Sequence, residues 1–442
     1  MYTVQGEFII NNEQINDNLI QDEFINNGLK TKRKNNNPIQ TFRLNPTELK
    51  LQTDIKELLK NNTFIRPHGY GHSDYFDNAF YVAENTINLQ KYTTIPNVVN
   101  NILTSSAGHT LGYLRDFLKP YGLRFLGTPE SQYITLGGAV VVGAHNGSKL
   151  QTSMSDYVVD MLVFDGNGDV KYINDPKLFI NYGMLGIVFR ISIKCFPAKN
   201  IYWRRIMHNS IDDVRITPYT HSLVFGPYSG KILEAQNYPT EMQPYKSIIR
   251  YLWELIPFLA SFKLVSNMLR GMFYLFPALG LIISEYFLLE PNVIRDKFDY
   301  FEPAPRTKVY TLEYGIDASY LKNVYTDIMN LIATYRNVGT YVSYRFWVRF
   351  MPASNSPNSL SFNKDSAIFE LTFSKDQPNA KSFATDIDRI FRSYGGRPHM
   401  GKTLINQNVF SNYDFNNLKK EITKYDPNKV YQNKFMRDVF II

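Results

Sequence analysis

The sequence predicts an α+β fold in two main parts, on three observations. The chain has 442 residues, 44% hydrophobic and 20% charged, which is a globular composition with more chain than one small core needs. Residues 39–199 alternate short strand-like and helical runs around two glycine-rich segments. Residues 200–394 alternate longer runs of both kinds, which is typical of an antiparallel sheet covered by helices. We expect residues 1–38 to form a polar arm and residues 395–442 a C-terminal segment of loop and helix.

The first part should begin with a helix in "NPTELKLQTDIKELLKNN". Thr47 is the expected cap and Asn61 and Asn62 the expected end. Its apolar stripe is Leu51, Ile55, Leu58 and Leu59. The segment "TFIRPHGYGHS" then predicts a strand that leads into the first glycine loop, and "AFYVAENTINLQKY" predicts a second strand.

Further along, "HTLGYLRDFLKPYGL" has leucines at helical spacing, and "TLGGAVVVGAHNGSKL" is the second glycine-rich segment. "YVVDMLVFDGNGDVKYI" predicts two strands around a tight turn, and "YGMLGIVFRISIKCF" predicts another strand. In the second part, "VYTLEYGID", "YVSYRFWVRFMPA" and "SAIFELTFS" predict strands, and "SYLKNVYTDIMNLIATY" predicts a helix.

One stretch, residues 248–289, is strongly apolar but interrupted by Arg250, Glu254, Lys263 and Arg270. Its longest uncharged piece, Gly271 to Ser284, is shorter than the roughly 20 residues that a spanning helix needs. Helices packed on the domain and an amphipathic element at a membrane surface both remain open.

Charge and cysteine content limit the kinds of ligand and site that this protein can have. The net charge of +8 suits an anionic ligand or surface, but no basic cluster interleaved with aromatic residues indicates nucleic-acid binding. A single cysteine, Cys195, excludes an internal disulfide or a multi-cysteine metal site, and we expect no metal. The first residues show no signal-peptide pattern, so we expect an intracellular protein, cytoplasmic or peripheral on a membrane.

The two glycine-rich segments are the first candidates for ligand binding. Gly69 and Gly71 in one, with Gly137, Gly138 and Gly143 in the other, allow backbone N–H groups to approach an anion closely. Each segment alone is weak evidence, because glycine pairs usually mark turns. No long helix follows Gly71 and no Gly-Lys-Ser/Thr ending is present, which disfavours a Rossmann dinucleotide site and a nucleoside triphosphatase.

The order of these motifs resembles a family. The series "RPHGYGHS", "GHTLGYLRDFL", "GTPESQYITLGGAVVVGAHNGS", "SDYVVDMLVFDGNGDV" and "YGMLGIVFRISIKC" is similar to the PCMH-type FAD-binding domain of the vanillyl-alcohol-oxidase superfamily. The C-terminal "GGRPHMGK" and "YDPNKVYQNKFM" resemble its sugar-lactone and alditol oxidase branch, which includes gulonolactone and D-arabinono-1,4-lactone oxidases. The resemblance implies a two-subdomain FAD-binding domain at 39–199 and a substrate or cap domain at 200–394.

The resemblance also implies cofactor contacts. The loop with Gly69, Tyr70, Gly71, His72 and Ser73 would bind the FAD pyrophosphate, and His72 matches a histidine that is covalently bonded to the flavin in many members. The second group implied near the cofactor is Gly137, Gly138, Gly143, His145 and Ile187.

For the substrate, the family places an arginine and a lysine over the flavin. Arg349 and Lys402 match these positions, and His399 lies beside the lysine. Fixed cations would stabilise the alkoxide that develops while hydride moves to flavin N5. This chain departs from the family at Trp347, where a glutamate is common, and at Met400, where an aromatic residue is usual.

The leading hypothesis is therefore an FAD-dependent oxidoreductase that oxidises an alcohol carbon of a polyol or sugar lactone, with O2 as acceptor. An alternative is a flavin-containing structural protein, because the cofactor motifs agree with the family pattern more closely than the substrate motifs do. A third possibility is a membrane-surface reductase of the sterol type, which the apolar stretch 248–289 suggests through membrane contact. A homo-oligomer is also left open.

Overall fold

The computed structural model describes residues 43–60, 64–71, 85–245, 278–296, 309–342, 344–405 and 411–440, with single positions between 250 and 276. The chain divides into two compact units, Met1–Arg43 and Leu44–Ile442. The predicted arm at 1–38 lies outside the described residues. All that follows concerns the second unit.

The first helix shows a sequence interpretation that was wrong in detail. Helix α2, Pro46–Leu59, is capped by Asn45 and not by Thr47. The Asn45 side chain accepts from the Glu48 backbone N–H, and the Glu48 side chain accepts from the Asn45 N–H, which is a capping box. Thr47 does not serve, because Pro46 takes the first helical position and the cap lies two residues before Thr47.

The first large sheet has five strands, all antiparallel, in the order β3-β4-β8-β6-β7. Its strands are β3 Asn97–Val99, β4 Ile102–Ser106, β6 Val158–Phe164, β7 Val170–Ile173 and β8 Ile187–Lys194. Two small sheets accompany it: β1 Ile65–His68 pairs in parallel with β2 Asn85–Asn88, and β5 Leu123–Arg124 pairs with β9 Phe196–Pro197. The helices of this part are α2, α3 Leu111–Leu118 and α4 Leu136–Val141.

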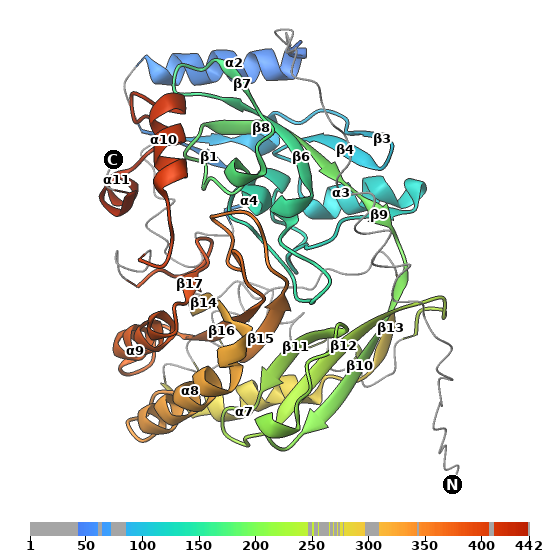
Figure 1. The fold of residues 1–442 in the computed structure, drawn as a ribbon, viewed down its shortest axis with the longest axis vertical. Helices are drawn as coiled ribbons and strands as arrows, with labels where there is room; N and C mark the ends of the chain where they lie inside the picture. Colours follow the sequence, from blue (N-terminus) through green and yellow to red (C-terminus); the bar gives the residue numbers. More distant parts are fainter. Residues whose placement is uncertain are drawn as a thin grey trace. The chain divides into compact units, whose positions relative to one another are not determined.

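The second large sheet has eight antiparallel strands in the order β13-β10-β12-β11-β15-β16-β14-β17 (Figure 1). Their bounds are β10 Asn200–His208, β11 Thr220–Phe225, β12 Ile232–Thr240, β13 Val293–Arg295, β14 Val309–Asp317, β15 Arg345–Met351, β16 Ser366–Ser374 and β17 Arg397–Pro398. The predicted strands at β14, β15 and β16 are confirmed, whereas β10, β11 and β12 were not identified individually. This sheet confirms the α+β class.

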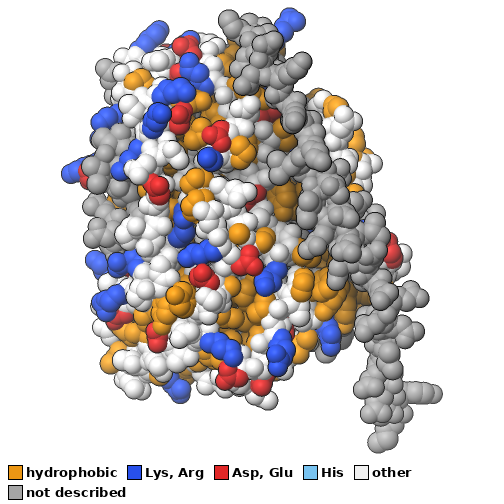
Figure 2. Space-filling view, in the orientation of Figure 1, with side chains coloured by type: hydrophobic (Ala, Val, Ile, Leu, Met, Phe, Trp, Pro, Cys, Tyr) orange, Lys and Arg blue, Asp and Glu red, His pale blue; other side chains and the backbone are white. Residues whose placement is uncertain are grey.

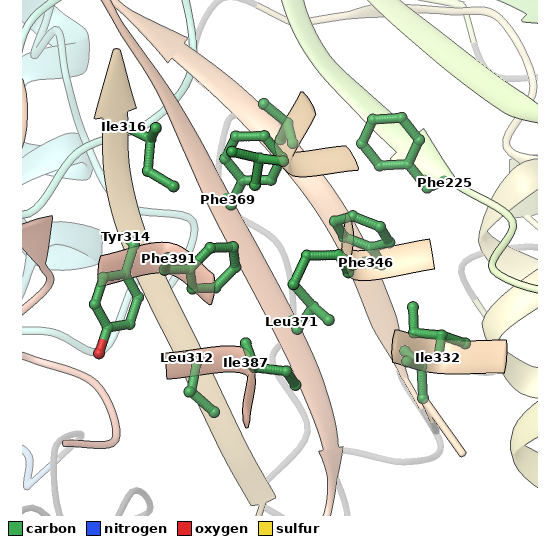
Figure 3. Close-up of a cluster of buried hydrophobic side chains, with 14 of the residues drawn as sticks. Phe225, Leu312, Tyr314, Ile316, Ile332, Phe346, Phe369, Leu371, Ile387 and Phe391 are labelled. Atoms are coloured by element: carbon green, nitrogen blue, oxygen red, sulfur yellow. The ribbon is translucent and has the colours of Figure 1, made fainter. Parts of the chain in front are cut away.

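Helices α8 Leu321–Arg336 and α9 Ala380–Ser393 cover one face of this sheet. Figure 3 shows Phe346, Phe369 and Leu371 from the strands lying against Ile332 of α8 and Phe391 of α9. These side chains are at most 2% exposed. The core therefore occupies the helix-covered face, and the strands' other side chains point away from it, since side chains alternate along a strand.

The C-terminal segment continues with α10 Asn416–Tyr425 and α11 Lys434–Phe440, and it contacts the first part of the chain. Ile65 donates its N–H to the Val430 carbonyl, and Arg66 donates to the Tyr431 carbonyl. The C-terminal residues thus lie next to the strand that leads into the first glycine loop.

Most of the apolar stretch at 248–289 lies outside the described residues, apart from α7 Leu279–Tyr286 and single positions. Among the described residues, no helix is both long and apolar enough to cross a membrane. Cys195 is buried, as expected, and burial raises the pKa of its thiol to about 12.

Candidate active site

The two glycine-rich segments meet at Thr135. A Cβ added to Gly69 would lie 2.8 Å from Thr135 Cγ2 and closer still to its Oγ1, so only glycine allows this approach. Thr135 also caps α4 through the Gly138 N–H. Tyr70, the next residue in the first loop, stacks on Tyr133 at 5.1 Å between ring centroids. The structure therefore brings together the two segments that were expected to form one cradle.

The remaining glycines fit a cradle lined by backbone. Gly71 and Gly143 have φ angles of 77° and 69°, in the left-handed region that favours glycine. A Cβ on Gly137 would lie 2.9 Å from Ala107 Cβ, whereas Gly138 is exposed and faces little besides Thr135. The segment thus packs tightly on one side and leaves backbone accessible on the other, which suits a bulky anionic cofactor such as FAD.

Three of the expected cofactor residues need separate mention. His72 and Ser73 lie outside the described residues, so the covalent bond stays a prediction. Ile187 begins β8, opposite Phe164 of β6, and its side chain is fully buried. Its implied place near the cofactor also stays a prediction.

On the substrate side, a row of side chains crosses three adjacent strands. In β14, β16 and β15, the residues Glu313, Glu370 and Trp347 are direct neighbours in register. Arg349 lies two residues after Trp347, on the same face of β15. This row holds the carboxylates that surround the predicted cation Arg349.

Glu313 is the centre of this cluster. Its carboxylate lies 3.0 Å from His145 Nε2, 3.3 Å from an Arg349 nitrogen and 3.2 Å from Lys402 Nζ. Burial by itself would raise the pKa of Glu313, but Lys402, Arg349 and His145 together hold it well below its usual range. Glu313 is therefore an ionised, fully engaged counter-ion.

Glu370 is the second carboxylate. It contacts Arg349, and its Oε2 lies 3.5 Å from Lys402 Nζ. Burial would lower the pKa of Arg349, yet Glu313 and Glu370 raise it above its ordinary value. The Lys402 side chain is 20% exposed, against 6% or less for Arg349 and the two glutamates, so the ammonium marks the open side of the cluster.

His399 lies in the turn that carries Lys402. Its backbone N–H donates to the Glu313 carbonyl, and its Nδ1 accepts the Gly401 N–H at 2.9 Å. Burial lowers the pKa of His399 to about 3, so its ring is neutral and the hydrogen sits on Nε2. His399 can therefore donate a hydrogen bond but is a poor base.

His145 was expected among the cofactor residues, but its ring contacts the cap sheet through Glu313. Next to it, Asn146 Oδ1 accepts from His221 Nε2 at 2.8 Å and from the Gly147 N–H at 2.9 Å. A Cβ on Gly147 would lie 3.0 Å from Arg349 Cβ. The end of the second glycine segment is thus docked on β11 and β15.

Trp347 occupies the position where the resemblance implied a glutamate. The guanidinium carbon of Arg349 lies 4.4 Å from the centre of the Trp347 ring, a cation–π distance. The acidic partners of Arg349 come from β14 and β16. Arg349 therefore has two acidic partners although position 347 carries no carboxylate. Met400 is buried, 1% exposed.

His145, Glu313 and His399 also place three potential metal-ligand atoms within 4.8 Å of one another. Two cations, Lys402 and Arg349, already contact the Glu313 carboxylate. The Glu313 oxygens are already engaged by these side chains, so we assign no metal to this group.

Sequence reasoning brought in Arg349, Lys402 and His399 but missed Glu313, Glu370, Asn146 and His221. A usable clue existed for the two glutamates. Each is the single charged residue within an otherwise apolar run of a strand, and a buried charge usually has a paired or functional role.

Known families match the two halves of the chain. The FAD-binding domain family matches residues 46–174, and the D-arabinono-1,4-lactone oxidase family matches residues 203–439, just over half of the chain. The second match includes the Glu313, Arg349, Glu370 and Lys402 cluster.

Individual relatives have low sequence identity to this chain. D-arabinono-1,4-lactone oxidase of Saccharomyces cerevisiae is 25% identical over 224 residues, which is 44% of this chain and 41% of that one. L-gulonolactone oxidase of Mus musculus is 21% identical over 367 residues, which is 76% of this chain and 81% of that one.

Solved structures agree in fold. A solvent-stable cholesterol oxidase superposes with a TM-score of 0.73 at 13% identity, covering 89% of this chain and 93% of that one. Cholesterol oxidase from B. sterolicum gives a TM-score of 0.72 at 14% identity, covering 90% and 93%. At such identities the likeness concerns the fold alone. With an FAD-binding domain in its first half, the chain belongs to the D-arabinono-1,4-lactone oxidase family.

Proposed function

We propose that the protein is an FAD-dependent oxidoreductase that oxidises an alcohol carbon of a sugar lactone or a polyol. The observation that carries this proposal is the cluster of Arg349 and Lys402 with Glu313 and Glu370, next to the end of the second glycine segment. The family and the relatives described above, which act as lactone oxidases by name, support this substrate class.

The residues on the substrate side prepare the hydroxyl group. Lys402, at the open side, and Arg349, deeper in the cluster, favour the alkoxide form by charge, and the neutral His399 can donate a further hydrogen bond. FAD, when bound, supplies the acceptor for the hydride. Removing one such group costs about 10²- to 10³-fold in kcat in well-studied oxyanion sites.

The cofactor itself would lie along Gly69 to Gly71 and along Gly137 to Gly143. We propose a covalent bond through His72 on the family resemblance. An absorption spectrum before and after acid precipitation tests it: yellow colour that stays with the precipitate supports a covalent flavin, and His72→Ala should release it.

The function is tested by anaerobic reduction of the flavin. Purified protein is mixed with L-gulono- and D-arabinono-1,4-lactones and with alditols, and bleaching of the flavin band near 450 nm is recorded. We expect bleaching with at least one compound, much slowed in Lys402→Met. Lys424→Met, which removes an exposed lysine of α10 paired with Glu421, is the matched control. No bleaching with any compound would contradict the proposal.

Oxygen as the acceptor is part of the proposal, and release of peroxide on reoxidation in air tests it. The alternative of a flavin-containing scaffold gains no support from the relatives described, which are oxidases. A scaffold would also have no need for the charged cluster around Glu313.

A second candidate property is contact with a membrane surface through residues 248–289. The described part of this stretch exposes Leu275, Phe276, Ile282 and Leu289, each 63–70% accessible. Figure 2 shows hydrophobic side chains on the lower part of the face in view, with basic side chains among them. Flotation with anionic and neutral vesicles tests it, and no retention on either would remove the idea.

A further inference from the structure

His145 has an unusual pair of neighbours. Its Nδ1 lies 2.7 Å from the Asn146 carbonyl oxygen, and its Nε2 lies 3.0 Å from Glu313 Oε1. A carbonyl oxygen can only accept, and an ionised carboxylate can only accept. Each ring nitrogen must then carry a hydrogen, which makes the ring an imidazolium. The side chain is 2% exposed, so water does not take the place of either partner.

The other way to satisfy this contact would put the proton on Glu313 and leave His145 neutral. Two further donors on the same carboxylate disfavour that arrangement, since Lys402 lies at 3.2 Å and Arg349 at 3.3 Å. These two cations and His145 outweigh burial and keep the pKa of Glu313 well below its usual range. The hydrogen between the two residues therefore belongs to the ring.

Several elements contribute charged or titratable side chains to the cluster around His145. Glu313 comes from β14, Glu370 from β16 and Arg349 from β15, while Lys402 and the neutral His399 come from the turn after β17. His221 of β11 reaches the same loop through Asn146 and is also neutral. Glu130, in the loop before α4, also acts on Arg349 and raises its pKa. Among these described groups, three positive charges face three negative ones once His145 is protonated.

We propose that His145 is a positioning residue held as an imidazolium, which occupies one side of Glu313 so that this carboxylate does not fully neutralise Lys402 and Arg349. With the imidazolium the charges of the cluster balance, whereas without it the carboxylates would outnumber the cations. Lys402 at the open side then remains available to an anion. The consequence for turnover rests on the proposed function, because the anion is the alkoxide of the substrate. The protonation of His145 does not rest on it.

The protonation is tested by NMR on the full-length, FAD-loaded chain labelled with ¹⁵N in histidine. The sequence has seven histidines, so the ring signals can be resolved. We expect one ring to carry hydrogens on both nitrogens at neutral pH, because both neighbours of the His145 ring are acceptors. That signal pair should vanish in His145→Gln. A neutral ring at His145, or no ring that stays doubly protonated, would overturn the proposal.

A second variant keeps the test decisive if His145→Gln does not fold. Glu313→Gln keeps the shape but removes the counter-ion, so the imidazolium should become a neutral ring under the same conditions. An imidazolium that survives this change would show that Glu313 does not hold the proton. His208→Gln is the matched control, because His208 makes a similar 2.9 Å contact with Glu234 elsewhere in the same sheet; the persistent signal should survive there.

The role in turnover has a separate readout. His145→Gln should lower kcat about 10-fold or more while KM changes less, because the lost charge matters most where the alkoxide develops. His208→Gln should leave both constants near wild type. If the wild-type chain reduces no flavin, the proposed function fails while the NMR result stands. If turnover is normal in His145→Gln, the positioning role fails.

Discussion

Glu370 lies directly opposite Trp347 in the β15–β16 pair, and it contacts Arg349, two residues further along β15. Arg349 is thus paired with a carboxylate from the neighbouring strand, although position 347, where the resemblance implied a glutamate, carries a tryptophan. Trp347 itself packs with Val224, Leu233 and Leu288 and presents its ring to the Arg349 guanidinium.

Glu370→Gln should lower kcat/KM about 10²-fold, because the carboxylate between Arg349 and Lys402 becomes a neutral amide. Glu370→Asp should recover part of the loss. The comparison uses steady-state turnover of the best lactone, with thermal unfolding to exclude misfolding. Glu421→Gln, on exposed α10, is the control, and an unchanged kcat/KM in Glu370→Gln would exclude a role for this carboxylate.

Gly69→Ala should weaken FAD binding at least 10-fold, because the new methyl group would collide with Thr135. Thr135→Ala removes both colliding atoms at the cost of the α4 cap, about 1 kcal/mol. The double variant should therefore bind FAD better than Gly69→Ala alone. Titration of the apoprotein with FAD measures this; a double variant no better than the single one would show that the contact with Thr135 is not the reason.

Stability should fall as the pH drops from about 6.5 toward 3. Burial lowers the pKa of His221 and of His399 to about 3, so in this window the unfolded chain binds protons that the folded chain refuses. Each histidine should lower the free energy of unfolding by about 2 kcal/mol when the pH falls from 7 to 5. Urea unfolding at both pH values should show a smaller drop in His221→Gln than in wild type, and parallel losses would contradict the assignment.

Arg66→Lys should lower the free energy of unfolding by about 3 kcal/mol. The buried Arg66 guanidinium donates to three carbonyls, those of Tyr182, Gly183 and Tyr431, and so joins the first glycine strand to the C-terminal segment. A lysine ammonium cannot reach all three. Arg115→Lys, on the surface of α3, is the control in urea unfolding. Equal midpoints for the two variants would refute a structural role for Arg66.

Local sequence patterns were sufficient to predict many of the helices and strands. The heptad-like leucines of α3 and the apolar alternation of β14 to β16 need only neighbours in the chain, because periods of 3.6 and 2 are local properties. The cap of α2 was misplaced by two residues because Asn45 and Thr47 are both good caps, and only the reciprocal bond with Glu48 selects one.

The candidate site was predicted only in part. Arg349, Lys402 and His399 came from a motif resemblance, since a motif is read along one segment. Glu313 and Glu370 could not be assigned, because their place beside Arg349 depends on the register of three strands that are distant in sequence.

By itself, the sequence determined the α+β class, the glycine segments and the cations, since composition, period and motif are written along the chain. The tertiary structure alone decided which carboxylates those cations meet and that His145 faces Glu313, since ion pairing depends on distance in space and on burial from water.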